Sequence, residues 1–285
     1  MSFKEPVIVT SPVNICGRNI RKALLELLDW EETSESFDGN PILRHKNIRL
    51  VLSKKDIIET DNCDSLGADL LIFGSRHKSE AQRASLLTHI PGNLGKDNSY
   101  GGNPLELAVA STRAIREAYL TLKQEHAVTP ELESFDVTVE ATHHGPTNMQ
   151  TPLIFIEVGS TITEYQNPFA IHAVAKTILS LCTNKPTQEI IPSICFGGGH
   201  YATRFNELME LTSVAVGHIL PKYQKDNLTV EIVEQMIAKT IEPVRLAIVD
   251  RSSLNATQIQ VIKDACSPHG IEVVKAKDVK YGKII

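Results

Sequence analysis

Short apolar runs alternate along this chain with segments in which apolar residues recur every three or four positions. Runs of this length predict β-strands, and the wider spacing predicts helices with one buried face. Residues 17–30 show the helical spacing, with Ile20 and Leu24 on the same face. The run 68–75 is mostly apolar, which indicates a central strand that is covered on both faces.

The pattern places strands and helices in alternation over the whole chain. Strands are expected at 6–11, 48–53, 68–75, 135–141, 153–160, 190–196, 244–250 and 271–274. Helices are expected at 17–30, 103–127, 167–182 and 229–241, from about 203, and after Asn255. The longest is predicted at 103–127, where Asn103 can cap the helix and Pro104 suits its first position. Asn167 and Pro168 repeat this opening.

This order predicts an α/β fold of three layers, α/β/α, around a mixed and mostly parallel sheet. The length of 285 residues and the hydrophobic share of 42% suit one large domain. We expect a single domain over 1–285, with about 225–285 as a small subdomain. The Gly- and Asn-rich stretch 91–104 is predicted to be a mobile active-site loop.

The composition limits the cellular setting. There is no run of 18 apolar residues and no apolar leader, so neither a membrane-spanning helix nor a secretory signal is expected. The five cysteines are scattered without a CxxC pair, which indicates free thiols in a reducing cytoplasm. Cys195 lies in an apolar strand and is expected in the core.

The net charge of −5 argues against a large nucleic-acid footprint. The most basic stretch is the C-terminal tail, for which a solvated, frayed end is the simpler explanation. Its lysines are Lys275, Lys277, Lys280 and Lys283.

Several of the ten histidines follow predicted strands, where ligands of α/β sheets usually bind. They are His77, His143, His144 and His200. His89 stands just before a Pro-Gly pair, and Glu140 precedes the His-His pair by three residues. Imidazoles beside a carboxylate are ligands that zinc prefers. Any one of these histidines is explained as well by an isolated loop residue, and only the group favours a metal site.

Three consecutive glycines precede His200. A glycine-rich turn that enters a helix exposes backbone N–H groups, which bind phosphates or oxyanions. The spacing of a dinucleotide site, GxGxxG, is absent. Gly198 and Gly199 are therefore candidates to hold an oxyanion, with Arg204 nearby for an anionic group. The alternative is a tight turn in which glycine only supplies a positive φ.

Five stretches together resemble the D-aminoacyl-tRNA deacylase family of the archaeal and plant type. They are GSRHKSE (74–80), LLTHIPGN (86–93), EATHHGP (140–146), FGGGHYATRF (196–205) and GHILPKY (217–223). The resemblance covers nearly the whole chain, although the family often has an acidic residue near the position of Asn14. It implies a zinc-dependent enzyme that hydrolyses the ester between a D-amino acid and the 3′-terminal adenosine of tRNA. It also implies a phosphorylase/hydrolase-like fold.

On this resemblance, zinc is expected to activate water for ester hydrolysis. The expected ligands are drawn from His77, His89, His143, His144 and His200. Glu140 or Glu157 is expected to take the proton. The terminal phosphates of the acceptor end are expected to be bound by Arg76, Arg204 and Lys222. Because neighbouring residues of a strand face opposite ways, His143 and His144 can share one metal only if the chain bends at Gly145–Pro146.

Three other functions fit the same residues: a zinc amidohydrolase or peptidase on a small substrate, a nucleoside phosphorylase that uses the glycine turn, and a non-enzymatic binder of the tRNA acceptor end. For the deacylase we expect the aminoacylated 3′ end of tRNA as partner, no DNA and no membrane. A cytoplasmic monomer is expected.

Overall fold

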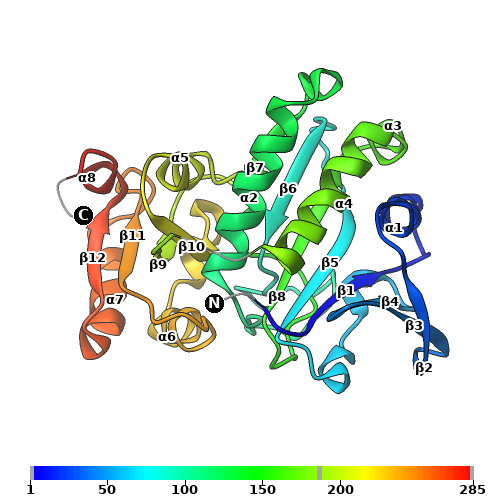
Figure 1. The fold of residues 1–285 in the computed structure, drawn as a ribbon. Helices are drawn as coiled ribbons and strands as arrows, with labels where there is room; N and C mark the ends of the chain where they lie inside the picture. The colour runs from blue at the N-terminus through cyan, green and yellow to red at the C-terminus, as the bar shows by residue number, and fades with distance from the viewer. Residues whose placement is uncertain (1–2, 185–187, 283–285) are drawn as a thin grey trace. The chain divides into compact units, whose positions relative to one another are not determined.

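The structure, a computed structural model, describes residues 3–184 and 188–282 of the chain, which forms two compact units (Figure 1). The first unit comprises Met1–Thr88, Glu117–Thr138 and Met149–Pro186. The second comprises His89–Arg116, Val139–Asn148 and Thr187–Ile285. The organisation as a single domain with 225–285 as a subdomain stays a prediction, and in the structure that segment lies within the second unit.

The first unit is built on a sheet of eight strands in the order β2-β3-β4-β1-β5-β8-β6-β7. The strands are β1 (Pro6–Thr10), β2 (Glu31–Phe37), β3 (Asn40–His45), β4 (Ile48–Leu52), β5 (Leu70–His77), β6 (Ser85–His89), β7 (Asp136–Val139) and β8 (Leu153–Gly159). β1 pairs in parallel with β4 and β5, and β5 in parallel with β8, whereas β3 is antiparallel to both β2 and β4. The predicted mixed, mostly parallel sheet is confirmed.

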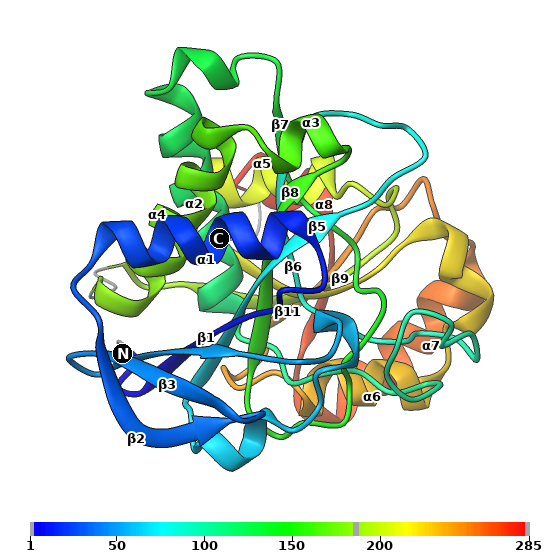
Figure 2. The same cartoon turned by 90° about the vertical axis from the view of Figure 1, so that its right-hand side faces the viewer.

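Three strands of this sheet, β2, β3 and β6, were not predicted. β2 is almost wholly polar and exposed, so no apolar run marks it in the sequence. Helices flank the central strands: α1 (Ile15–Leu27) packs against α4 (Pro168–Thr183) and against β5 (Figures 1 and 2). The short α3 (Ile162–Tyr165) precedes α4. The side chain of Asn167 accepts hydrogen bonds from the first N–H groups of α4, with Pro168 at the first helical position, as predicted.

The second unit holds a parallel sheet of four strands in the order β10-β9-β11-β12. The strands are β9 (Ile191–Phe196), β10 (Val214–Leu220), β11 (Leu246–Val249) and β12 (Glu272–Lys275), and the helices are α5 (Thr203–Leu211), α6 (Val230–Ala238), α7 (Ala256–Cys266) and α8 (Ala276–Lys280). α7 packs on α6 and β12, and α5 on β10 and α8. Parallel strands with flanking helices confirm the α/β class.

The helix predicted at 103–127 is wrong in its first third, because α2 spans only Thr112–Ala127. The preceding residues form a turn at 104–105 and then pair with other segments. Their isolated bridges join Leu107 to Gly92 and Ala110 to Thr240. The carboxylate of Glu242 then accepts hydrogen bonds from the Thr112 N–H and the Ser111 hydroxyl at the start of the helix. Pairing across the fold thus overrides the local Asn-Pro signal.

All five cysteines are free and buried, which confirms the predicted thiols and the core position of Cys195. Burial raises the pKa of the Cys195 thiol well above its usual value. Within residues 3–184 and 188–282, no helix is both long and apolar enough to cross a membrane. Of the basic tail, Lys283 lies outside the described residues, while Lys280 forms an ion pair with Glu207.

Candidate functional site

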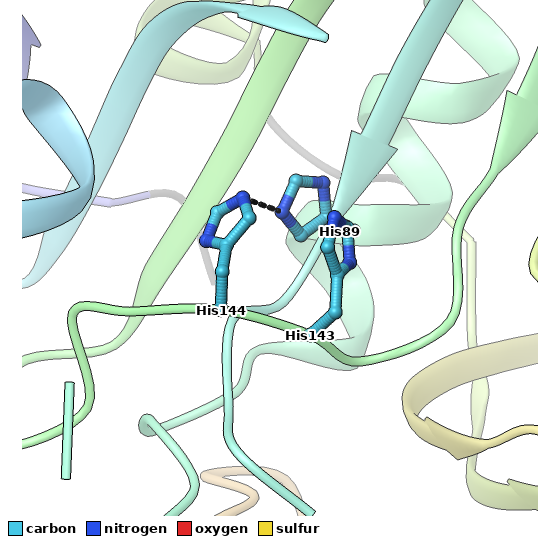
Figure 3. Close-up of side chains that lie close together, drawn as sticks. All are labelled: His89, His143 and His144. Carbon is cyan, nitrogen blue, oxygen red and sulfur yellow. Dashed lines mark hydrogen bonds between the residues drawn. The ribbon is translucent and has the colours of Figure 1, made fainter. Parts of the chain in front are cut away.

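Four of the five predicted ligand histidines come together in the second unit. His89 is the last residue of β6, His143 and His144 follow β7, and His200 follows β9. The ring centroid of His143 lies 4.3 Å from that of His89, 4.4 Å from that of His144 and 4.7 Å from that of His200. Figure 3 shows the rings of His89, His143 and His144 facing one another from two segments of the chain.

The backbone at Gly92 joins these two segments. Its N–H donates to the carbonyl oxygen of His144 at 2.7 Å and lies 3.2 Å from that of His143. A Cβ on Gly92 would lie 2.8 Å from the side chains of Leu107 and Thr142, so only glycine allows this approach. His144 has a φ of +44°, which turns the chain out of the strand direction. The bend needed for both histidines to face one point therefore begins at His144 itself.

Backbone carbonyls fix which nitrogen of the two adjacent rings carries the proton. His143 Nδ1 lies 2.8 Å from the carbonyl oxygen of Ala141, and His144 Nδ1 lies 2.6 Å from that of Gly145. A carbonyl oxygen only accepts hydrogen bonds, so each Nδ1 is the donor. In a neutral ring the lone pair is then on Nε2, which is the usual second-shell arrangement of metal-binding histidines.

Glu140 lies between His89 and His200, with its side chain fully buried. One carboxylate oxygen lies 3.5 Å from His89 Nδ1, and the other lies 2.8 Å from His200 Nε2. An ionised carboxylate only accepts, so it favours a proton on each nitrogen that faces it. The lone pair of a neutral His89 ring is then on Nε2.

These proton positions fit a cation among His89, His143 and His144. His89 Nε2 and His144 Nε2 are 3.2 Å apart, and two lone pairs at this distance repel unless a proton or a metal ion lies between them. Zinc held tetrahedrally at its usual Zn–N distance keeps neighbouring ligand nitrogens about 3.3 Å apart. The three histidines each offer a ligand atom within 4.8 Å of the others. A second group within the same limit joins His143 to Glu140 and His200.

Comparison with known proteins places the chain. The model of a family described as D-aminoacyl-tRNA deacylase matches residues 65–274. The chain belongs to the D-aminoacyl-tRNA deacylase family. This membership confirms the predicted resemblance and the prediction of an enzyme of the deacylase type.

Relatives named D-aminoacyl-tRNA deacylase match over almost their full length. The one from Methanosarcina acetivorans is 32% identical over 97% of this chain and 94% of its own, and the one from Aeropyrum pernix is 33% identical over 90% and 94%. A crystal structure of a conserved protein of unknown function has a TM-score of 0.89 at 28% identity and covers 99% of this chain and 98% of its own. That structure shares the α/β fold of this chain.

Tyr223 is a site residue of this family member that the sequence did not single out. Its hydroxyl lies 2.9 Å from His200 Nδ1, so the ring of His200 is held between Tyr223 and Glu140. Burial, and then the nearby carboxylate of Glu140, raise the pKa of the phenol to about 12. The hydroxyl is therefore a donor at neutral pH. Its position in the GHILPKY motif, just past β10, was the available signal.

His77 and Glu157 lie in the first unit on the paired strands β5 and β8, where His77 is in register with Gly159 and Glu157 with Ser75. Both are buried, and His77 Nδ1 lies 3.9 Å from a carboxylate oxygen of Glu157. The carbonyl oxygen of His77 also accepts a hydrogen bond from the hydroxyl of Tyr165. Their parts as metal ligand and as base in the deacylase stay predictions.

Two of the three glycines in the turn 197–199 are required by the backbone conformation and by hydrogen bonds within the protein. Gly197 and Gly198 have φ values of +100° and +78°, where other residues are strained. The Gly197 N–H donates to the Leu220 carbonyl, and the Gly198 N–H donates to the Ser253 hydroxyl at 3.0 Å. The amide of Gly198 is thus already used within the protein, whereas Gly199 is exposed. The oxyanion role stays a prediction, and Gly199 suits it better.

The three predicted phosphate-binding cations lie at the surface. Arg204 Nε lies 3.5 Å from a carboxylate oxygen of Asp250, and Lys222 is exposed at the position after β10 and Pro221. Both belong to the second unit, whereas Arg76, 3.8 Å from Asp56, belongs to the first. Exposed ion pairs of this kind are weak, so an acidic neighbour does not prevent phosphate binding.

His218, whose role the sequence left open, is fully buried behind the site, with Nδ1 3.4 Å from the Thr142 hydroxyl. Burial lowers its pKa from 6.5 to about 4. A lowered pKa in the folded state means that the neutral ring stabilises the fold above pH 6.5. This contribution is lost as the pH falls from 6.5 towards 4.

We therefore expect His218→Gln to flatten the pH dependence of stability between pH 7 and 5. The shift corresponds to about 3 kcal/mol when it is fully expressed. Free energies of unfolding from urea titrations at several pH values would measure it, with the exposed His172→Gln as control. If the free energy of unfolding of the His218 variant depends on pH as steeply as that of the wild type, another group governs stability between pH 7 and 5.

Proposed function

We propose that this protein hydrolyses the ester bond of D-aminoacyl-tRNA, releasing the D-amino acid and free tRNA, with zinc held by His89, His143 and His144. The observation that carries the proposal is that His89, His143 and His144 each offer a ligand nitrogen within 4.8 Å of the others, beside the buried Glu140. Its relatives are named for this activity. Substrate and metal are both consistent with the site, since acyl esters are cleaved by an activated water.

When bound, zinc supplies Lewis-acid activation of water and of the ester carbonyl. The chain supplies the orientation of the ligands. Hydrogen bonds from His143 Nδ1 to Ala141 and from His144 Nδ1 to Gly145 hold the two rings in one tautomer. Glu140 faces His89 from the opposite side, with a carboxylate oxygen 3.5 Å from Nδ1, and its negative charge favours a proton on that nitrogen. Such partners typically change metal affinity or activity 10- to 100-fold when they are removed.

Glu140 and His200 carry the proton in this proposal. As the water oxygen bonds to the ester carbonyl carbon, its proton passes to His200 Nδ1, because the side chain of His200 is 33% exposed and that of Glu140 is fully buried. The Nε2 proton of His200 moves to the Glu140 oxygen 2.8 Å away. When the carbon–oxygen bond to the ribose breaks, the reverse transfer delivers a proton to the leaving 3′-oxygen. Tyr223 donates to Nδ1 in the resting state and positions the ring.

The acceptor end of tRNA is held near this site by single cations. Arg204 and Lys222 are exposed in the same unit as the histidines and suit the terminal phosphates. In the same proposal, Arg76 also binds the terminal phosphates, and the backbone N–H of Gly199 holds the oxyanion. A net charge of −5 suits a protein that grips the end of tRNA and leaves its body largely untouched.

The substrate test compares release of D-Tyr and L-Tyr from matched charged tRNAs. We expect hydrolysis of the D-ester and sparing of the L-ester, since a site rejects one hand by steric clash or by leaving a buried polar group unpaired. Several D-aminoacyl esters should be cleaved, because a proofreader reads chirality. Equal rates for both hands would remove the chiral assignment and favour a general esterase. A steep fall of activity with salt would reveal contact with the tRNA body.

A further inference from the structure

We propose that Tyr100 forms a stacking platform for the base of the terminal nucleotide, a subsite that rests on the proposed function and extends it from the ester to the nucleobase. Its side chain is 70% exposed, the second-highest exposure among the large apolar residues of the described chain. Single exposed aromatic residues are common, so exposure alone is weak evidence for a binding site. Tyr100 differs from the other exposed aromatic residues in its contact with the histidine turn and in the hydrogen bonds that brace its loop.

Tyr100 is joined directly to the histidine turn. Its carbonyl oxygen accepts a hydrogen bond of 3.0 Å from the N–H of Gly145, the residue after His144. A Cβ on Gly145 would lie 2.3 Å from the backbone N of Gly102, so the loop and the turn touch through backbone atoms alone. The backbone of Tyr100 is therefore fixed directly beside the turn that carries His144.

The loop that carries Tyr100 is exposed over residues 96–100 but tied at its base. The Asn93 amide donates to the carbonyls of Gly101 and Asn103, and the Asn103 N–H donates to the Thr147 hydroxyl at 2.8 Å. Within the loop, the Gly101 N–H donates to the Asn98 carbonyl. These hydrogen bonds fix the backbone from which the exposed ring of Tyr100 extends, so less backbone freedom is lost when a ligand binds there.

The ligand follows from the reaction. The ester sits on the terminal ribose, so the base on that same ribose lies within one nucleotide of the histidines. Single-stranded ends of RNA are recognised chiefly by stacking of bases on aromatic side chains. Replacing an aromatic residue that stacks on a base by alanine typically lowers the affinity for the nucleic acid 5- to 100-fold. Tyr100 is an exposed aromatic residue bonded to the His144 turn, whereas the hydroxyl of Tyr223, which is 56% exposed, is already engaged by His200.

The test measures binding separately from hydrolysis. The probe is a short oligoribonucleotide with the 3′ sequence of tRNA that carries no amino acid. A second probe lacks only the terminal base. We expect Tyr100→Ala to weaken binding of the first probe 5- to 100-fold and Tyr100→Phe to change it less than about twofold. The control Tyr281→Ala removes another tyrosine, 61% exposed, that follows α8, and should bind like the wild type.

The probe without the base should bind wild type and Tyr100→Ala equally, because the interaction that the variant removes is then already missing. Equal binding of the complete probe by both proteins would overturn the stacking subsite. In hydrolysis of D-Tyr-tRNA, Tyr100→Ala should raise KM with kcat almost unchanged. A wild type that binds the probe through Tyr100 but hydrolyses no D-ester would refute the proposed function and leave the subsite standing.

Discussion

Removal of metal is expected to abolish hydrolysis of D-Tyr-tRNA, and addition of zinc is expected to restore it. The purified protein should contain zinc, because the Nε2 atoms of His89 and His144 face each other at 3.2 Å while carbonyls or a carboxylate engage the other ring nitrogens. Elemental analysis before and after chelation gives the stoichiometry, and initial rates give the activity.

A second measurement makes this prediction independent of turnover. Zinc that binds only the folded protein must raise its melting temperature, and above the Kd the rise grows with the logarithm of the free zinc concentration. We expect that rise in the wild type and in the control His172→Ala, whose exposed ring bonds only the Pro168 carbonyl of its own helix. It should be lost in His89→Ala. Full activity of protein shown to be metal-free would remove the mechanism.

Loss of either member of the His-His pair is expected to lower kcat by two or more orders of magnitude. Each ring contributes one Nε2 directed into the cluster, and three-ligand sites do not tolerate loss of a ligand. Stability should change modestly, since both rings are only half-buried and removing them opens no core cavity. Turnover and urea unfolding of His143→Ala and His144→Ala would be compared with His172→Ala.

The backbone at His144 calls for a matched variant. With a φ of +44°, any side chain with a Cβ, histidine and alanine alike, carries strain of about 1 kcal/mol at this position. His144→Gly keeps the turn without that strain and still removes the imidazole. We expect the same collapse of kcat in both. Near-wild-type turnover in the glycine variant would show that His144 serves the turn alone.

The sequence by itself determined the elements whose signals are local. The periodic apolar face of α1 and the Asn-Pro opening of α4 place these helices to within a few residues. The same holds for strands that are apolar throughout, such as β5 and β8, because their burial on both faces leaves a continuous signature. The histidine-rich motifs and the family to which they belong were also present in the order of residues.

Other features depended on contacts between distant residues. The polar strand β2 has no apolar pattern, and residues 103–111 form a turn at 104–105 and isolated bridges to Gly92 and Thr240 in place of a helix. The position of Tyr223 beside His200 arises where the ends of β9 and β10 meet.

The chemistry of the site was also determined partly by the sequence and partly by the tertiary structure. The sequence placed histidines and a carboxylate near strand ends, and this was enough to suggest zinc. Tertiary structure decided which nitrogen of each ring is exposed to a metal, because that depends on the carbonyls of Ala141 and Gly145 and on the buried carboxylate of Glu140. A hydrogen bond to one ring nitrogen selects the tautomer, and its partner is known only once the chain has folded.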